Sequence, residues 1–291
     1  MPVKKRRASA GSAAAARSRT ASRIGTYSKG EYIKVVPLHT PKPAISIDRL
    51  IAAPSDTELF EGRPPEAAAT PHLVYSGGPL LTKVEVFTVF WGQKWTATAG
   101  ATIAAKLNDF FRAILVSPAI DQLAEYDVAG KKIGHGSLIG SATISANAPA
   151  GSVTDTTIRT RLKAWIRART VPAATANRLY FIYLDPGIIS IMGGAKSCSS
   201  YCGYHDAVGN IYYAVMPYPN CSGCLGGLSA FDALTGTSSH ELCEAITDPV
   251  PGSGWYDDQN GEVGDICAWR FKTVAGYRVQ LEWSNAHNTC V

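Results

Sequence analysis

The run His240-Glu241-Leu242-Cys243-Glu244 carries side chains that can bind a metal ion. On an α-helix, residues four apart lie on one face, so His240 and Glu244 can both approach a single cation. Glu241 then lies to the side, where its carboxylate can hold a water molecule bound to that cation. Zinc peptidases use the same arrangement in their His-Glu-x-x-His helix. The run therefore predicts a zinc-binding helix in which Glu244 stands where those enzymes have a second histidine.

A closed zinc site needs a further ligand from another part of the chain. Glu262 and Asp265 follow within 25 residues of His240. The Pro-Gly-Ser-Gly run at residues 251–254, between the predicted helix and these two acids, supplies a bend. We predict a metal site formed by His240, Glu244 and an acid from Glu262 or Asp265. Zinc lowers the pKa of a bound water toward about 7, and Glu241 would act as the general base that takes its proton. The predicted reaction is hydrolysis of a bond in a peptide or protein substrate.

Structural roles compete with this prediction. Ser238 and Glu241 have the spacing of a capping box, in which Glu241 would accept a backbone N–H at a helix start. His240 and Glu244 would then form a pair on the helix surface. Residues 257–262 place carboxylate and amide oxygens around a glycine, as in a calcium-binding turn, so calcium is an additional candidate cofactor.

His205, which follows Cys202-Gly203-Tyr204, is the candidate from outside this region for a third ligand or a catalytic oxyanion donor. A single histidine is more often structural, so that role stays open. His135, between glycines, and His287, near the end of the chain, have no neighbouring residue that suggests a site.

The chain has seven cysteines, and the odd number leaves one without a partner. Cys243 lies inside the predicted helix and is the natural unpaired one. The first four of the other six can form two disulfides or bind a structural zinc, and a redox role for Cys221 and Cys224 is a further alternative. The six are Cys198, Cys202, Cys221, Cys224, Cys267 and Cys290.

The charge of the chain is concentrated at one end. Residues 1–30 contain eight of the 28 Lys and Arg residues and no acid, which leaves 20 basic and 23 acidic residues in the remainder, a net charge of about −3. Residues 1–70 are therefore predicted to be a basic tail and a Pro-rich extended linker. No apolar run approaches the length of about 18 residues that a membrane span needs, and the tail lacks the apolar stretch of a secretory signal.

The remaining pattern determines the fold class. Apolar strands and amphipathic helices interleave, so residues 71–291 are predicted to form one α/β or α+β domain with a mixed sheet flanked by helices. Residues 211–216 are the candidate edge strand that would align an extended substrate.

The chain contains no phosphate-binding loop, nucleophile elbow or aromatic-basic pattern, so ATPase, serine hydrolase and specific nucleic-acid functions are disfavoured. The other predicted elements are strands at 73–75, 83–91, 179–184 and 277–283 and helices at 101–116, 155–169 and 228–248, the last interrupted near Gly236.

The order of several short motifs resembles the Exordium-like, or phosphate-induced protein, family over about residues 72–291. The motifs are 73–81, 86–92, Cys202-Gly203-Tyr204-His205, the pair Cys221 and Cys224, and the late cysteines Cys267 and Cys290. Residues 239–249, 254–256 and 261–265 look like a microbial branch with a peptidase-style helix.

This resemblance implies a disulfide between Cys267 and Cys290 and an extracellular or cell-surface location, although no signal peptide is visible. The best-known family members are secreted plant proteins without an established reaction. The alternative function is therefore a non-enzymatic extracellular protein that binds a partner or takes part in signalling. The sequence does not determine the oligomeric state.

Overall fold

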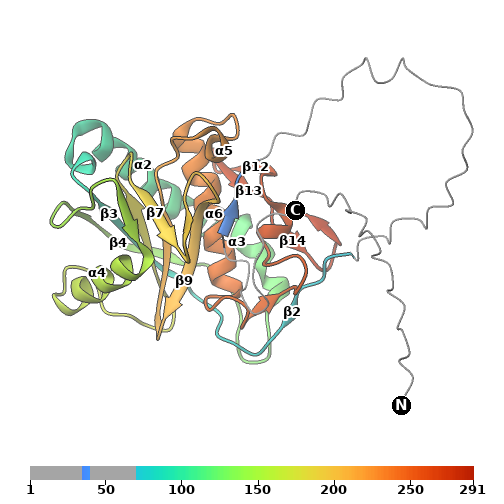
Figure 1. Cartoon of the computed structure of the whole chain (residues 1–291). Helices are drawn as coiled ribbons and strands as arrows, with labels where there is room; N and C mark the ends of the chain where they lie inside the picture. The colour runs from blue at the N-terminus through green and yellow to red at the C-terminus, as the bar shows by residue number, and fades with distance from the viewer. Residues whose placement is uncertain (1–34, 40–69) are drawn as a thin grey trace, which may run out of the picture.

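A computed structural model of the chain describes residues 35–39 and 70–291. Its largest sheet has six strands in the order β1-β9-β10-β6-β3-β4 (Figure 1). The strands are β1 (Val35–Pro37), β3 (Glu85–Trp91), β4 (Ser137–Ile144), β6 (Arg178–Leu184), β9 (Tyr201–Val208) and β10 (Ile211–Met216). β3, β4, β6 and β10 run parallel, whereas β9 is antiparallel to both β10 and β1. The sheet is mixed and helices pack on it, which confirms the predicted fold class.

Alternate residues of β3 face different layers, because successive side chains of a strand point to opposite faces of the sheet. Val86 and Phe90 join a core with α2 (Thr98–Ile114) and α6 (Ala230–Thr247). Val89 and Trp91 join a second core with α4 (Asp155–Arg167). The sheet is therefore covered on both faces, which explains the nearly continuous apolar sequence of β3.

The helix α6 lies at the centre of the molecule, between the six-stranded sheet and the C-terminal segments (Figure 1). It starts after Ser229, whose side chain accepts the Asp232 backbone N–H, and it continues through Gly236 without a break. The Cβ of any other residue at Gly236 would lie 2.7 Å from the Phe271 ring, so this glycine allows close packing rather than ending the helix. Ser238 and Glu241 lie inside the helix, so the alternative that they form a capping box is wrong.

Shorter elements complete the described part of the chain. Several form small two- or three-stranded sheets beside the main one. They are β2 (Val74–Tyr75), η1 (Lys94–Thr96), α3 (Pro118–Asp121), η2 (Gln122–Tyr126), β5 (Ser152–Thr154), β7 (Ile189–Met192), β8 (Ala195–Lys196), α5 (Ser222–Leu225), β11 (Trp255–Tyr256), η3 (Asp265–Cys267), β12 (Phe271–Val274), β13 (Tyr277–Gln280), β14 (Trp283–Ser284) and β15 (Thr289–Cys290).

Two features of the sheet differ from the sequence predictions. β10 matches the predicted strand 211–216 but lies between β9 and β6, so it is not an edge strand that could align a substrate. Val35–Pro37, which the composition assigns to a linker, forms β1 at the sheet edge and buries Val35 and Val36. The basic residues 1–30 lie outside the described residues.

Three disulfides join Cys198 to Cys221, Cys202 to Cys224 and Cys267 to Cys290, and Cys243 is free and buried. The predicted disulfides and the predicted unpaired cysteine are confirmed, and the sulfurs of the first two pairs are bonded to each other rather than to a structural zinc. Three disulfides fit an extracellular protein. In the part of the chain that the structure describes, every helix is too short or too polar to cross a membrane.

Candidate metal centre

The six residues singled out as catalytic or metal-binding come together in one place, which we call the acid–histidine cluster: His205, His240, Glu241, Glu244, Glu262 and Asp265. β9 carries His205, and α6 carries His240, Glu241 and Glu244. The segment after β11 supplies Glu262 and Asp265. The side chains of the two histidines and of Glu241 and Glu244 are at most 1% exposed, and that of Asp265 is 5% exposed.

His205 faces carboxylates with both ring nitrogens. Its Nδ1 lies 3.0 Å from Oε2 of Glu241 and 3.5 Å from Oε2 of Glu244. Its Nε2 lies 3.5 Å from Oε1 of Glu262 and 3.1 Å from the carbonyl oxygen of Asp248. Donor atoms about 2.1 Å from a tetrahedral zinc are about 3.4 Å apart. The two 3.5 Å contacts involve opposite nitrogens of the His205 ring, so a single ion at this ring would use one nitrogen, and the other would remain available for a hydrogen bond.

His240 has a comparable environment. Its Nε2 lies 2.9 Å from Oε1 of Glu244 and 3.9 Å from Oδ1 of Asp265. On the other side of the ring, the Gln280 side-chain amide lies 2.8 Å from Nδ1 and also donates to the carbonyl oxygen of Gly264. Glu244 and Asp265 thus converge on His240 as predicted, whereas Glu262 approaches His205.

Within the acid–histidine cluster, two trios of residues have metal-ligating atoms that lie within 4.8 Å of one another. One trio is His205, Glu244 and Glu262, and the other is His240, Glu241 and Glu244. Glu244 belongs to both. The one-turn spacing predicted His240 and Glu244 as ligands with Glu241 as a base beside them, and the fold adds His205 by placing β9 beside α6.

Many polar atoms of the cluster have no hydrogen-bond partner among the described residues. They are Oε1 of Glu241, Oε2 of Glu244, both carboxylate oxygens of Glu262 and Oδ1 of Asp265. A buried polar atom without a partner costs about 1–3 kcal/mol, and more if it is charged. Such a concentration of unpaired acceptors around two imidazoles is the arrangement that a bound cation would stabilise.

The shifted pKa values of the cluster residues also indicate that a bound cation would stabilise the cluster. Burial raises the pKa of Glu262 well above its usual value, and His205 only partly opposes this. Burial also acts to raise the pKa of Glu244, but His240 and His205 outweigh it and lower this pKa to about 2. Burial opposes a charge on His205, yet the carboxylates of Glu262, Glu241 and Glu244 raise its pKa well above the usual value. Without a cation, protons must compensate the excess of acids.

Gly264 lets the segment after β11 approach α6. A Cβ at this position would lie 2.8 Å from Nδ1 of His240 and 2.9 Å from Oε1 of Glu244. The next backbone N–H, that of Asp265, donates to Oε1 of Glu244 over 3.0 Å. The close approach is therefore possible only for glycine, and it encloses the cluster.

Gln280 and Glu282, near β13, are contributors that the sequence motifs did not reveal. Glu282 is 1% exposed, and neither carboxylate oxygen has a hydrogen-bond partner among the described residues. Burial raises its pKa well above the usual value. Gln280 is the last residue of β13 and Glu282 lies between β13 and β14. Single polar residues in or beside a strand are common in any sequence, so only the fold reveals the position of these two beside α6.

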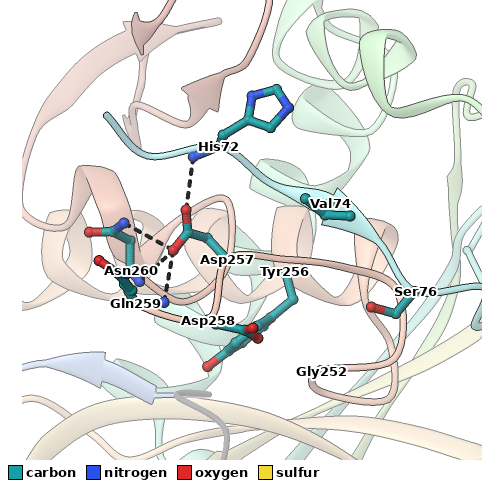
Figure 2. A pocket seen from close by; sticks show the side chains of 9 residues that line it. All are labelled: His72, Val74, Ser76, Gly252, Tyr256, Asp257, Asp258, Gln259 and Asn260. Atoms are coloured by element: carbon teal, nitrogen blue, oxygen red, sulfur yellow. Dashed lines mark hydrogen bonds between the residues drawn. The ribbon is translucent and has the colours of Figure 1, made fainter. Parts of the chain in front are cut away.

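Residues 257–262, the candidate calcium-binding turn, do not direct all of their carboxylates toward one point. The Asp257 carboxylate accepts the backbone N–H groups of His72, Gln259 and Asn260, as Figure 2 shows. Glu262 turns away from this loop into the acid–histidine cluster. The residues around Asp257 line a cavity of about 370 Å³ that includes none of the six cluster side chains. Hydrogen bonds to Asp257, including one from His72, thus hold the turn in place, and the Glu262 side chain belongs to the acid–histidine cluster instead.

The disulfide between Cys202 and Cys224 anchors the strand that carries His205. Cys202 lies three residues before His205 on β9, and Cys224 belongs to the short helix α5 that precedes α6. This link fixes β9 next to the start of α6. The Cys-Gly-Tyr-His motif thus combines an anchor and a cluster residue.

Comparisons with protein-family models and with curated proteins gave no significant match to this chain.

Proposed function

We propose that this protein binds a divalent cation in the acid–histidine cluster, with His205, Glu244 and Glu262 as ligands. The observation that carries the proposal is the set of buried, unpaired carboxylate oxygens beside two imidazoles. Nitrogen and carboxylate ligands together suit zinc or a neighbouring first-row metal better than calcium, which prefers oxygen ligands alone. We name zinc as the cation to test first.

When bound, the cation would compensate part of the negative charge of the clustered acids and join three separate parts of the chain. His205 comes from β9, Glu244 from α6 and Glu262 from the segment after β11. All three residues are 0% exposed, so the centre is closed to solvent. A closed centre supports a structural role for the ion, as in proteins whose fold is stabilised by a metal.

The experiment is a zinc titration against a chromophoric chelator. Glu262→Gln keeps the size of the side chain and removes its charge, and we expect zinc affinity to fall by about 100-fold or more. Asp232→Asn is the matched control, because Asp232 lies on the same helix α6 but bonds to Ser229 at its start. Equal affinities in the Glu262→Gln variant and the wild type would exclude Glu262 as a ligand.

Zinc-dependent hydrolysis of peptides is the second candidate function. The observation in its favour is Glu241: its Oε1 has no hydrogen-bond partner within residues 35–39 and 70–291, and its Oε2 lies 3.0 Å from Nδ1 of His205. A substrate would reach these groups only if the segment around Gly264 moved. The test is peptidase activity of zinc-loaded protein. Loss of turnover with full metal content in Glu241→Gln would identify a base, whereas absence of activity in the wild type would remove this candidate.

The resemblance to the Exordium-like family is consistent with the closed centre and is part of this proposal. A disulfide-bonded extracellular protein with a structural metal needs no catalytic opening. Its partner would then bind elsewhere on the surface, and the cation would hold the fold in place.

A further inference from the structure

We infer that the acid–histidine cluster binds two divalent cations, with Glu244 as a carboxylate bridge between them. This inference rests on the proposed function and extends it from one ion to two. The first ion belongs to the trio of His205, Glu244 and Glu262. The second belongs to the trio of His240, Glu241 and Glu244, with Asp265 next to it.

The two oxygens of Glu244 face different histidines. Oε2 lies 3.5 Å from Nδ1 of His205, and Oε1 lies 2.9 Å from Nε2 of His240. A carboxylate with one oxygen directed to each of two ions spans the separation of about 3.5–4 Å that is usual in two-metal sites. Glu244 is thus placed between two positions rather than within one.

The second trio has unpaired atoms of its own. Oε1 of Glu241 and Oδ1 of Asp265 are buried and have no hydrogen-bond partner among the described residues. An ion held by His205 and Glu262 would leave these two atoms unsatisfied. A second ion beside His240 would satisfy them.

Charge also favours two ions. Four carboxylates, those of Glu241, Glu244, Glu262 and Asp265, surround the two histidines. One divalent cation compensates at most two of these four negative charges, and the buried Glu282 beside α6 adds a further acid. A second cation reduces the remaining excess of negative charge, which favours its binding because a buried net charge is costly.

The two ions should differ in affinity, because the outer partners of the histidines differ. The Asp248 carbonyl oxygen, 3.1 Å from Nε2 of His205, accepts a ring N–H and suits a histidine bound through its other nitrogen. The Gln280 Nε2 amide, 2.8 Å from Nδ1 of His240, is itself a donor. An ion on Nε2 of His240 puts the proton on Nδ1, so this amide must rotate. We therefore expect the ion beside His240 to bind more weakly.

The test is the zinc content of the full-length protein, measured by elemental analysis after saturation with zinc and removal of the excess. We expect two zinc ions in the wild type and in the control Asp232→Asn, and one in Asp265→Asn. Glu262→Gln should also retain one, and Glu244→Ala should retain none. Circular dichroism checks that each variant is folded, and His240→Gln replaces Asp265→Asn if that variant does not fold.

The outcomes separate the two claims. One zinc in the wild type, unchanged in both Asp265→Asn and His240→Gln, overturns the two-ion inference and leaves the proposed function intact. No zinc in the folded wild type overturns both. Two zinc ions that persist in Glu244→Ala show that Glu244 does not bridge them and also overturn the inference.

Discussion

Nδ1 of His205 lies 3.5 Å from Oε2 of Glu244, although the first residue belongs to β9 and the second to α6. The two side chains meet because β9 packs against α6. Both are fully buried. An imidazole and a carboxylate held in this way, with further acids nearby, could hold a cation.

Replacing Gly264 by alanine should weaken zinc binding. The added methyl group would lie 2.8 Å from Nδ1 of His240, so the covering segment would have to move away from α6. We expect a loss of about 1–3 kcal/mol in the free energy of unfolding, measured by urea denaturation, and a lower zinc affinity. Gly134→Ala is the control, because a Cβ there meets no atom within 4 Å. If both variants behave like the wild type, the cover over the cluster is not as close as described.

Zinc binding should release protons. The pKa values of His205 and Glu262 are raised in the ion-free protein, so both groups retain protons that a cation must displace. Apparent affinity should therefore rise with pH up to these raised pKa values and become constant above them. Calorimetric titrations near neutral pH in two buffers with different ionisation enthalpies measure the number of protons. An identical heat in both buffers would contradict this prediction.

Removing the metal should destabilise the fold. A ligand that binds only the folded state adds about 4 kcal/mol when its free concentration is 1,000 times its dissociation constant. We therefore expect a chelator to lower the midpoint of thermal unfolding and added zinc to restore it. Differential scanning calorimetry of the full chain measures the shift. The Glu244→Ala variant should show no response to either reagent, which separates specific binding from a general effect of the chelator.

Alkylation of the unfolded, unreduced protein should modify one cysteine of seven, Cys243. The other six form disulfides. One joins Cys198, before β9, to Cys221, before α5; a second joins Cys202 of β9 to Cys224 of α5; and the third joins Cys267 to Cys290 in the C-terminal segment. After reduction all seven should react. Mass spectrometry of the alkylated peptides provides the count, and labelling of Cys202 before reduction would show that the anchor next to His205 is absent.

The sequence predicted the helical part of the centre well. The spacing of His240 and Glu244 requires only one helix, so local periodicity was sufficient, and α6 ends at Thr247 as the following prolines suggest. Gly236 was misleading, because its role is to pack against Phe271 rather than to break the helix.

The ligands that come from distant parts of the chain could not be predicted from local periodicity. β9 is buried on both faces and contains polar residues such as His205 and Asp206, so it lacks the alternation of an ordinary strand. The sequence offered either Glu262 or Asp265 as a ligand. In the structure both acids lie in the cluster. Glu262, on a loop, lies near His205, and Asp265, at the start of the short 3₁₀ helix η3, lies near His240.

Elemental analysis of natively purified wild type and of the Glu244→Ala variant tests most directly whether the acid–histidine cluster binds a divalent cation. We expect at least one divalent first-row metal ion per wild-type chain, removed by prolonged dialysis against a chelator, and no bound metal in the folded variant. A folded wild type without metal that also takes up none from solution, or a Glu244→Ala variant with the wild-type content, would contradict it.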